Sequence, residues 1–550
     1  MTIYLKKIVL ALILNCFLLG AYANTSSIQW ATCPTKDQLG NVITSIPGFK
    51  CGYFQVPLDY QHPNQGRTSL FMTLHKATGT KLGTIIYNFG GPWNDNVTYL
   101  RSIGGNLPPA DILAHYDVAT FLNRGVSDGT QFTCHTNNPE QLKFVEEQIA
   151  QINISTPANT DKLYQLSKEK AALCQYPNII HYADTHQTVN DLEEFRKALN
   201  IKQFDYYGGS YGTRLGLAYM MTYPNSMRNA VLDGNMAPNN DAMVVFNDWA
   251  ATNEQTIKFL FQSCVDAKSQ CPLYDPTAGL STAQEMQNAY LNLLQTLSAN
   301  DNDTHKINAG ELNALTFQIV SDNATYPTLM TALKPAIVNH QFAELTKAYS
   351  AAMSYDFKSG TYAANFWPIY QTALEVPSTV FPADYTNYRQ LADEQNWQDF
   401  ISEKLAAYPL LGGYMAATQA SLYIAPPAKS NPLLPADGGK LPEFKGQVLL
   451  LGNRYDPRTP YPWTQQVYQL LQKNHITSSL TTWTGAGHEA YQINTPDGGC
   501  ADTTVNDFFI SKTLPPSKTC TDGTNPFLNT TNKALLSSKS VQSNIMNVKK

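Results

Sequence analysis

Charged side chains are scarce in this sequence. Asp, Glu, Lys and Arg together make up 15% of the 550 residues, whereas about 25% is typical of soluble proteins. The formal net charge is −5, and no long cluster of Lys and Arg occurs anywhere along the chain. Nucleic-acid-binding proteins and proteins steered to anionic membranes carry strongly basic patches. We therefore expect neither nucleic acid nor a membrane surface as a partner.

Familiar zinc-binding patterns are also missing. The sequence contains no Cys-x-x-Cys pair and no His-Glu-x-x-His motif, which are the spacings that bring zinc ligands together. Beyond the first residues, no stretch is long and apolar enough to span a bilayer. We expect a protein that works without a metal or a cofactor and without stable membrane insertion.

The first residues have the features of an export signal. Lys6 and Lys7 precede an apolar run over residues 8–19, and Ala21 and Ala23 provide the small residues that signal peptidases accept. This pattern predicts a signal peptide over residues 1–23 that is cleaved after Ala23, and hence a secreted or periplasmic protein. An uncleaved membrane anchor is the alternative, but the run is shorter than the roughly 20 residues that span a bilayer.

The cysteine count agrees with export. Of nine cysteines, Cys16 lies in the predicted signal, which leaves an even number, and an even number in an exported chain indicates disulfides. Eight cysteines allow many connectivities, so the sequence alone fixes none of them. Pairing in sequential order would close four short loops, and we predict these pairs: Cys33 with Cys51, Cys134 with Cys174, Cys264 with Cys271, and Cys500 with Cys520.

Hydrophobic residues make up 43% of the chain and aromatic residues 11%, enough for a large buried core. Residues 53–56 and 70–74 flank a turn at 63–66 and predict an antiparallel hairpin. The short apolar runs at 84–89 and 118–122 are typical of strands buried on both faces. Because these runs alternate with helical stretches, we expect a mostly parallel sheet.

The pattern changes in the middle of the chain and then returns. Residues 236–442 are rich in Ala, Leu, Gln and Asn and read as helical, whereas β-like runs reappear near residue 447. An α/β pattern that is interrupted and resumed predicts one domain with an inserted lid. We expect a core over 24–235 and 443–527, a helical lid over 236–442, and a flexible tail over 528–550.

Residues 208–212 match the Gly-x-Ser-x-Gly motif, which lifts a serine hydroxyl off the end of a strand. A strand-like run at 204–207 precedes the motif and a helical run at 213–221 follows it. Upstream, Thr188 and Asp191 resemble a capping box that opens a crossover helix. The motif therefore predicts Ser210 as a nucleophile, and a simple glycine-rich turn is the alternative.

Such a serine needs a base, and the base needs an acid to orient it. His488 lies in a glycine-rich loop after a predicted strand, and Asp456 follows the strand at 447–451. Asp233 competes as the acid because it also ends a predicted strand. The order Ser210, Asp456, His488 is the one expected for an α/β-hydrolase fold.

Backbone amides must stabilise the oxyanion that forms when the serine attacks a carbonyl. The amide that follows the nucleophile belongs to Tyr211, and the glycine-rich turn at 89–93 offers a second donor, for which we favour Gly91.

The chain resembles the secreted tripeptidyl aminopeptidases of the prolyl aminopeptidase family, which are α/β-hydrolase serine peptidases. The resemblance implies a mostly parallel sheet with a large helical lid inserted before the acid and histidine loops, and exopeptidase action on free amino termini. Family members usually continue Gly-Gly-Pro with glycine, whereas Trp93 stands there in this chain. The segments that carry the resemblance are Cys51-Gly52, residues 56–60, 90–92, 124–126, 208–213, 231–234 and 271–273, Asp456-Pro457, Thr459-Pro460, residues 485–488, Cys500 and Cys520.

The resemblance leaves the substrate open. An aminopeptidase needs carboxylates for the substrate ammonium, and Glu254, Asp233 and acidic residues of the lid are candidates. A secreted carboxylesterase or lipase with the same three residues is the alternative enzyme, and a binding protein on an inactive hydrolase scaffold is the alternative outside enzymes.

Overall fold

The computed structural model describes residues 27–36, 42–102, 108–127, 134–154, 156–176, 178–239, 241–301, 303–363, 380–426, 431–432, 440–496 and 498–528. The predicted signal peptide and all of the predicted tail after Leu528 lie outside the described residues. Ten strands form the main sheet: β1 (Gln29–Ala31), β2 (Lys50–Pro57), β3 (Arg67–His75), β4 (Gly83–Asn88), β5 (Tyr116–Phe121), β6 (Phe204–Gly209), β7 (Met227–Asp233), β10 (Gln447–Tyr455), β11 (Ser478–Ala486) and β12 (Lys518–Cys520).

The sheet has the order β1-β2-β3-β5-β4-β6-β7-β10-β11-β12. From β5 to β12 all neighbouring strands are parallel, whereas β1, β2 and β3 pair antiparallel at one edge. The predicted hairpin is β2 with β3, and the predicted buried strands are β4, β5, β10 and β11. The mostly parallel sheet is therefore confirmed.

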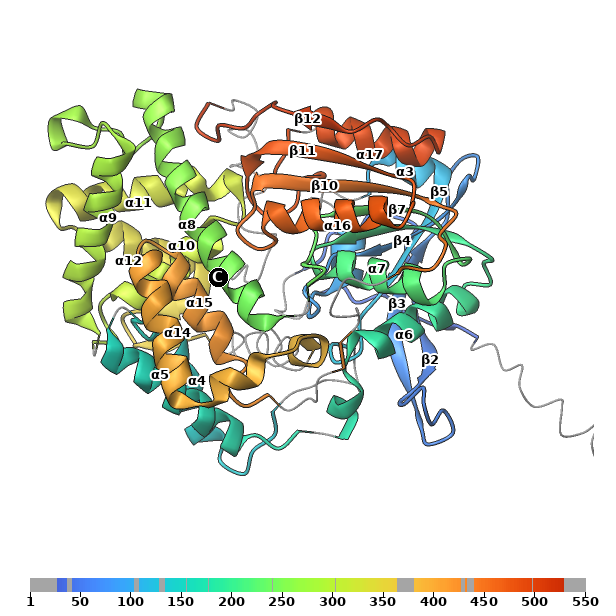
Figure 1. Ribbon diagram of the computed structural model, residues 1–550, viewed down its shortest axis with the longest axis horizontal. Helices are drawn as coiled ribbons and strands as arrows, with labels where there is room; N and C mark the ends of the chain where they lie inside the picture. The colour runs from blue at the N-terminus through green and yellow to red at the C-terminus, as the bar shows by residue number, and fades with distance from the viewer. Residues whose placement is uncertain are drawn as a thin grey trace, which may run out of the picture.

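Helices cover both faces of this sheet (Figure 1). One face carries α6 (Thr185–Ala198), α7 (Tyr211–Thr222) and α16 (Tyr461–Lys473), and the other carries α2 (Asn96–Arg101), α3 (Ala110–His115) and α17 (Cys500–Ser511). Successive strand residues alternate between two apolar clusters, as side chains with a period of two must. Ile86 and Leu232 belong to the first cluster, and Ile85 and Val231 to the second.

A helical layer lies beside the sheet, at the left of Figure 1, and has an apolar core of its own. Most of it comes from the chain between β7 and β10. Two further helices from between β5 and β6, α4 (Pro139–Gln151) and α5 (Pro157–Leu173), pack against it. The domain boundaries stay a prediction. The remaining elements of this layer are α8 (Ala242–Ala267), α9 (Ala283–Leu297), α10 (Ala309–Ile319), α11 (Tyr326–Asn339), α12 (Ala343–Met353), the hairpin β8 (Tyr355–Asp356) with β9 (Thr361–Tyr362), α14 (Glu394–Ala407) and α15 (Gly412–Ser421).

The start of α6 differs from its prediction. The helix begins one turn earlier, and the side chain of Asp184 caps it by accepting a hydrogen bond from the Gln187 amide. Asp191 does not take part in a capping box. It is buried and forms a two-pronged ion pair with Arg124, with 2.6 Å between each guanidinium nitrogen and its carboxylate oxygen. The carboxylate that the sequence pattern assigned to a capping box therefore forms a long-range ion pair instead.

Replacing Arg124 by Leu should lower the free energy of unfolding by about 3–5 kcal/mol, because the variant leaves Asp191 charged and unpaired in the core. The guanidinium also donates to the backbone oxygens of Leu58 and Tyr182, at 3.0 Å each. Urea denaturation measures the change. The exposed Arg67, which donates to one backbone oxygen, provides the matched control R67L, and equal effects of the two changes would contradict the prediction.

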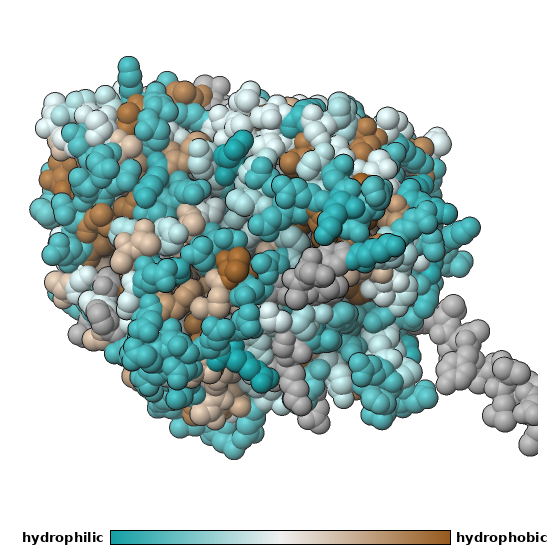
Figure 2. Space-filling view, in the orientation of Figure 1, coloured by the Kyte–Doolittle hydropathy of each residue, from teal (hydrophilic) through white to brown (hydrophobic). Residues whose placement is uncertain are grey.

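Four disulfides join the cysteines in the sequential order predicted: Cys33 with Cys51, Cys134 with Cys174, Cys264 with Cys271, and Cys500 with Cys520. Such bonds fit an exported protein. Among the described helices, none combines the length and the apolar character needed to cross a bilayer. The face in Figure 2 is mostly hydrophilic, with apolar side chains scattered over it.

Candidate active site

Ser210 lies on the sharp turn between β6 and α7. Its backbone has φ 51° and ψ −122°, a conformation that costs a residue with a side chain about 1–3 kcal/mol. The flanking glycines make the turn possible, because a Cβ on Gly208 would lie 2.5 Å from the Gly212 carbonyl oxygen. The Ser210 amide donates to the Asp233 carbonyl oxygen at 2.9 Å. The turn therefore has the geometry of a nucleophile elbow.

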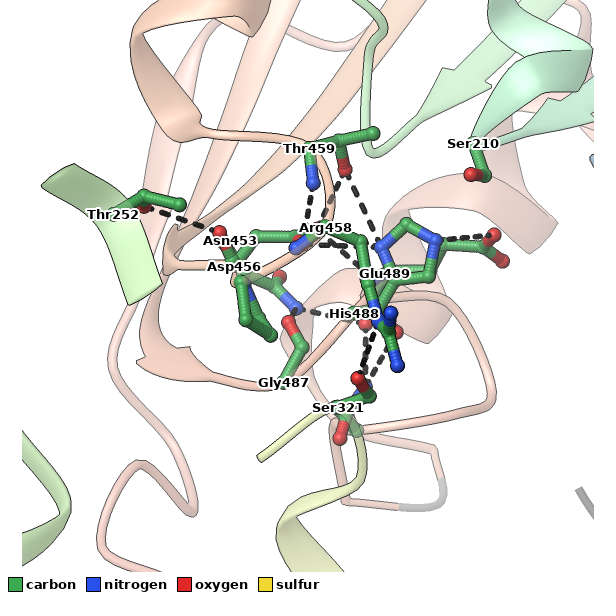
Figure 3. A network of polar contacts seen from close by, with 12 residues as sticks. Ser210, Thr252, Ser321, Asn453, Asp456, Arg458, Thr459, Gly487, His488 and Glu489 are labelled. Atoms are coloured by element: carbon green, nitrogen blue, oxygen red, sulfur yellow. Dashed lines mark hydrogen bonds and ion pairs between the residues drawn. The ribbon is translucent and has the colours of Figure 1, made fainter. Parts of the chain in front are cut away.

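The imidazole of His488 is held by Asp456. His488 follows β11 by two residues, and its Nδ1 lies 3.0 Å and 3.1 Å from the two carboxylate oxygens of Asp456. A carboxylate at Nδ1 fixes the tautomer in which Nε2 can accept a proton. Among the described residues no hydrogen bond joins Nε2 to Ser210, although Figure 3 shows the hydroxyl and the imidazole at the same corner of the site. Hydrogen bonds between catalytic groups often form only with substrate bound.

Asp456 is fully buried at the end of β10. Its carboxylate accepts hydrogen bonds from the amide of Arg458 at 2.8 Å and from the amide and hydroxyl of Thr459 at 2.9 and 2.8 Å. Burial acts to raise its pKa, but the His488 imidazole and these donors outweigh burial and hold the pKa below its usual value. Asp456 is therefore ionised at neutral pH, as an orienting acid must be.

Asp233, the rival acid, has a different environment. Its carboxylate accepts from the backbone amides of Ala490 at 3.0 Å and Tyr491 at 2.8 Å. Asp233 therefore anchors the loop after His488, whereas Asp456 contacts the imidazole itself. Burial raises the pKa of Asp233 to about 6, despite the two amide donors that lower it.

This raised pKa predicts a pH dependence of stability. Below about pH 4 the carboxyl is protonated in both states, and as the pH rises to about 7 the unfolded chain loses this proton before the folded protein does. The raised pKa of Asp233 therefore adds about 3 kcal/mol to the free energy of unfolding at low pH. This contribution is lost as the pH rises through about 6. In Asp233→Asn the residue cannot titrate, so the stability of the variant relative to wild type should rise by that amount between about pH 4 and 7. Denaturation series at several pH values measure it, and parallel curves would contradict it.

The glycine-rich turn after β4 packs onto the elbow. A Cβ on Gly90 would lie 2.7 Å from Ser210 Cβ and 2.8 Å from the Tyr211 amide nitrogen, so only glycine fits there. The Gly90 amide donates to the Asn88 side chain at 3.0 Å. Because that amide is engaged, Gly91 stays the predicted second donor beside Tyr211.

Trp93 packs against the large apolar cluster of the core. The Trp93 ring is therefore held by apolar packing.

The helical layer contacts the loops that carry the acid and the base. The backbone oxygen of Ser321, just after α10, accepts from the His488 amide at 2.7 Å. The Ser321 hydroxyl accepts from Arg458 Nε at 2.7 Å, and the guanidinium lies 3.4 Å from the centroid of the Phe317 ring. These contacts fix the two loops relative to each other.

Two further groups of polar side chains make contacts within the protein. The carboxylate of Glu254, a candidate for the substrate ammonium, accepts from the amides of Leu410 and Leu411 at the start of α15 and pairs with Lys258 at 3.1 Å. Among the described residues, Cys500, Cys520 and Asp522 lie close enough for a metal, but the two cysteines form a disulfide.

Glu489 is the residue that the sequence analysis missed. Its carboxyl oxygen Oε1 lies 3.5 Å from His488 Nε2, on the opposite side of the ring from Asp456. The sequence shows an acidic residue directly after the proposed base. It does not show that the side chain of this residue lies beside the imidazole.

Two family models match parts of this chain. The family model described as "alpha/beta hydrolase fold" matches residues 109–266, and the one described as "TAP-like protein" matches residues 416–520. The fold and these matches define a serine hydrolase of the α/β-hydrolase class. Within that class, residues 416–520 are similar to the TAP-like proteins.

Three curated relatives have related names. Serine protease Hip1 of Mycobacterium tuberculosis is 24% identical over 510 residues, which are 89% of this chain and 90% of the relative. Tripeptidyl aminopeptidase of Streptomyces lividans is 28% identical over 257 residues, 43% of this chain and 46% of the relative. Putative hydrolase YuaR of Escherichia coli is 26% identical over 346 residues, 60% of this chain and 64% of the relative.

Proposed function

We propose that this protein is an exported serine exopeptidase that hydrolyses peptide bonds near free amino termini, of the tripeptidyl or prolyl type. The observation that carries the proposal is the pairing of Asp456 with His488 Nδ1 beside the strained elbow of Ser210. The relatives named serine protease and tripeptidyl aminopeptidase support peptides as the substrates. The four disulfides support a secreted or periplasmic location.

In the proposed reaction, His488 Nε2 takes the proton of Ser210 as the hydroxyl attacks the peptide carbonyl. Asp456 stabilises the imidazolium that results. The amides of Tyr211 and Gly91 donate to the oxyanion. The imidazolium then protonates the leaving nitrogen, and water hydrolyses the acyl-enzyme by the same sequence of proton transfers. Every step uses groups of this chain and water.

The test compares coumarin amides of one, two and three residues, each with a free and with a blocked amino terminus. We expect cleavage of the free forms and little cleavage of the blocked ones. A blocked amino terminus carries no charge, so it would leave the carboxylates that bind the substrate ammonium buried and unpaired. Equal rates on both forms would overturn the exopeptidase assignment. Cleavage of esters without any amide hydrolysis would instead favour a carboxylesterase.

A further inference from the structure

Glu489 fills a space that two glycines leave open. A Cβ on Gly209, the residue before the nucleophile, would lie 2.6 Å and 2.7 Å from the two carboxyl oxygens of Glu489. A Cβ on Gly234 would lie 3.3 Å from Glu489 Cγ. The side chain is only 5% exposed. The carboxyl is therefore held directly beside the elbow that carries Ser210.

This carboxyl also borders the leaving-group side of the site. Nδ1 of His488 is occupied by Asp456, so Nε2 is the nitrogen that receives the Ser210 proton and delivers it to the leaving group. Glu489 Oε1 lies 3.5 Å from that same Nε2. Figure 3 shows the Ser210 hydroxyl above the side of the imidazole on which Glu489 contacts Nε2. A leaving nitrogen within reach of Nε2 is therefore also close to Glu489.

The charge state of Glu489 suits a hydrogen-bond acceptor. Burial raises its pKa well above the usual range, and the carboxylates of Asp233 and Asp456 raise it further. A neutral carboxyl keeps an accepting carbonyl oxygen but does not compete strongly for the proton of the imidazolium. Apart from the contact with Nε2, neither oxygen accepts a hydrogen bond within the described part of the chain. An acceptor is thus available beside the nucleophile.

We propose that Glu489 accepts a hydrogen bond from the N–H of the scissile amide and thereby favours amides over esters. This inference rests on the proposed peptidase function and names the group that distinguishes it from an esterase. An ester has oxygen in place of that N–H and cannot donate. A peptide bond before proline also lacks the hydrogen, so the same contact disfavours cleavage there.

The step in which the contact acts is the collapse of the tetrahedral intermediate. The carbon then carries Ser210 Oγ, the oxyanion, the acyl chain and the scissile nitrogen with its one hydrogen. His488 Nε2 gives its proton to the lone pair of that nitrogen, the C–N bond breaks with its electrons going to nitrogen, and the oxyanion re-forms the carbonyl. The amine leaves neutral with both hydrogens, and the original hydrogen points to Glu489 throughout.

The experiment compares 4-nitroanilides of one, two and three residues, each with a free amino terminus, with the matching 4-nitrophenyl esters, using kcat/KM because it reports acylation for both substrates. In Glu489→Met the value for the amide should fall about 10–100-fold, the loss expected for one hydrogen bond, while the ester changes less than about threefold. Glu489→Gln keeps an acceptor oxygen and should retain amide activity within about fivefold. A general loss of structure would lower kcat/KM for the amide and for the ester equally. The ratio of the two values therefore separates loss of the hydrogen bond from loss of structure.

Two controls complete the test. Glu311, buried in the capping box at the start of α10, provides the variant Glu311→Met, which should leave the amide-to-ester ratio unchanged. In the wild-type protein, N-methylation of the anilide should lower kcat/KM at least about tenfold, because it removes the donor without altering the protein. An unchanged ratio in Glu489→Met, or full tolerance of N-methylation, would overturn the role of Glu489 alone. A wild-type protein that cleaves esters but no amides would overturn the proposed function as well.

Discussion

Replacing Asp456 by Asn should lower kcat by about 10⁴-fold, because an amide at Nδ1 stabilises the wrong tautomer of the imidazole. The matched change Asp233→Asn should lower kcat less than about tenfold, since its carboxylate contacts the backbone amides of residues 490 and 491 rather than the ring. Steady-state hydrolysis of a peptidyl coumarin amide measures both variants.

The comparison decides between two acids that the sequence could not separate. Both carboxylates are fully buried, so simple loss of a buried charge affects the two variants alike. Far-ultraviolet circular dichroism and urea denaturation establish that each variant is folded. A larger loss in Asp233→Asn than in Asp456→Asn would assign the orienting role to Asp233 and refute the contact seen at His488.

Replacing Ser210 by Ala should abolish turnover, with a fall in kcat of about 10⁵–10⁶-fold, because no other group can form the acyl-enzyme. The variant should also fail to react with a fluorophosphonate probe. Ser511, exposed at the end of α17, gives the control Ser511→Ala, which should label and turn over like wild type. Full labelling of the Ser210 variant would exclude this residue as the nucleophile.

The main elements of the site could be predicted because their signals are local. Ser210 lies in a five-residue motif between a strand and a helix, and His488 and Asp456 each follow an apolar strand. The role of Glu489 could not be predicted, because it depends on the space beside Gly209 and Gly234. The contact of Glu254, one of the candidates for the substrate ammonium, with the first amides of α15 spans a sequence distance that no local pattern covers.

The fold shows the same division. The capping box of α9, in which Thr282 and Glu285 bond reciprocally, is a local pattern within the region predicted as helical. The start of α6 was misplaced because Asp191 pairs with Arg124, a partner brought close only by the tertiary structure. The helix α4 is amphipathic, and its sequence fits a position against the sheet as well as one in the helical layer.

The contact between Ser321 and the loops of His488 and Asp456 has a consequence for biogenesis. The proposed nucleophile, Ser210, is synthesised well before His488 and the segment around Ser321 that contacts its loop. A nascent chain that has reached only Ser210 therefore lacks the proposed base. In the proposed mechanism the site is therefore complete only when the helical layer has docked against these two loops.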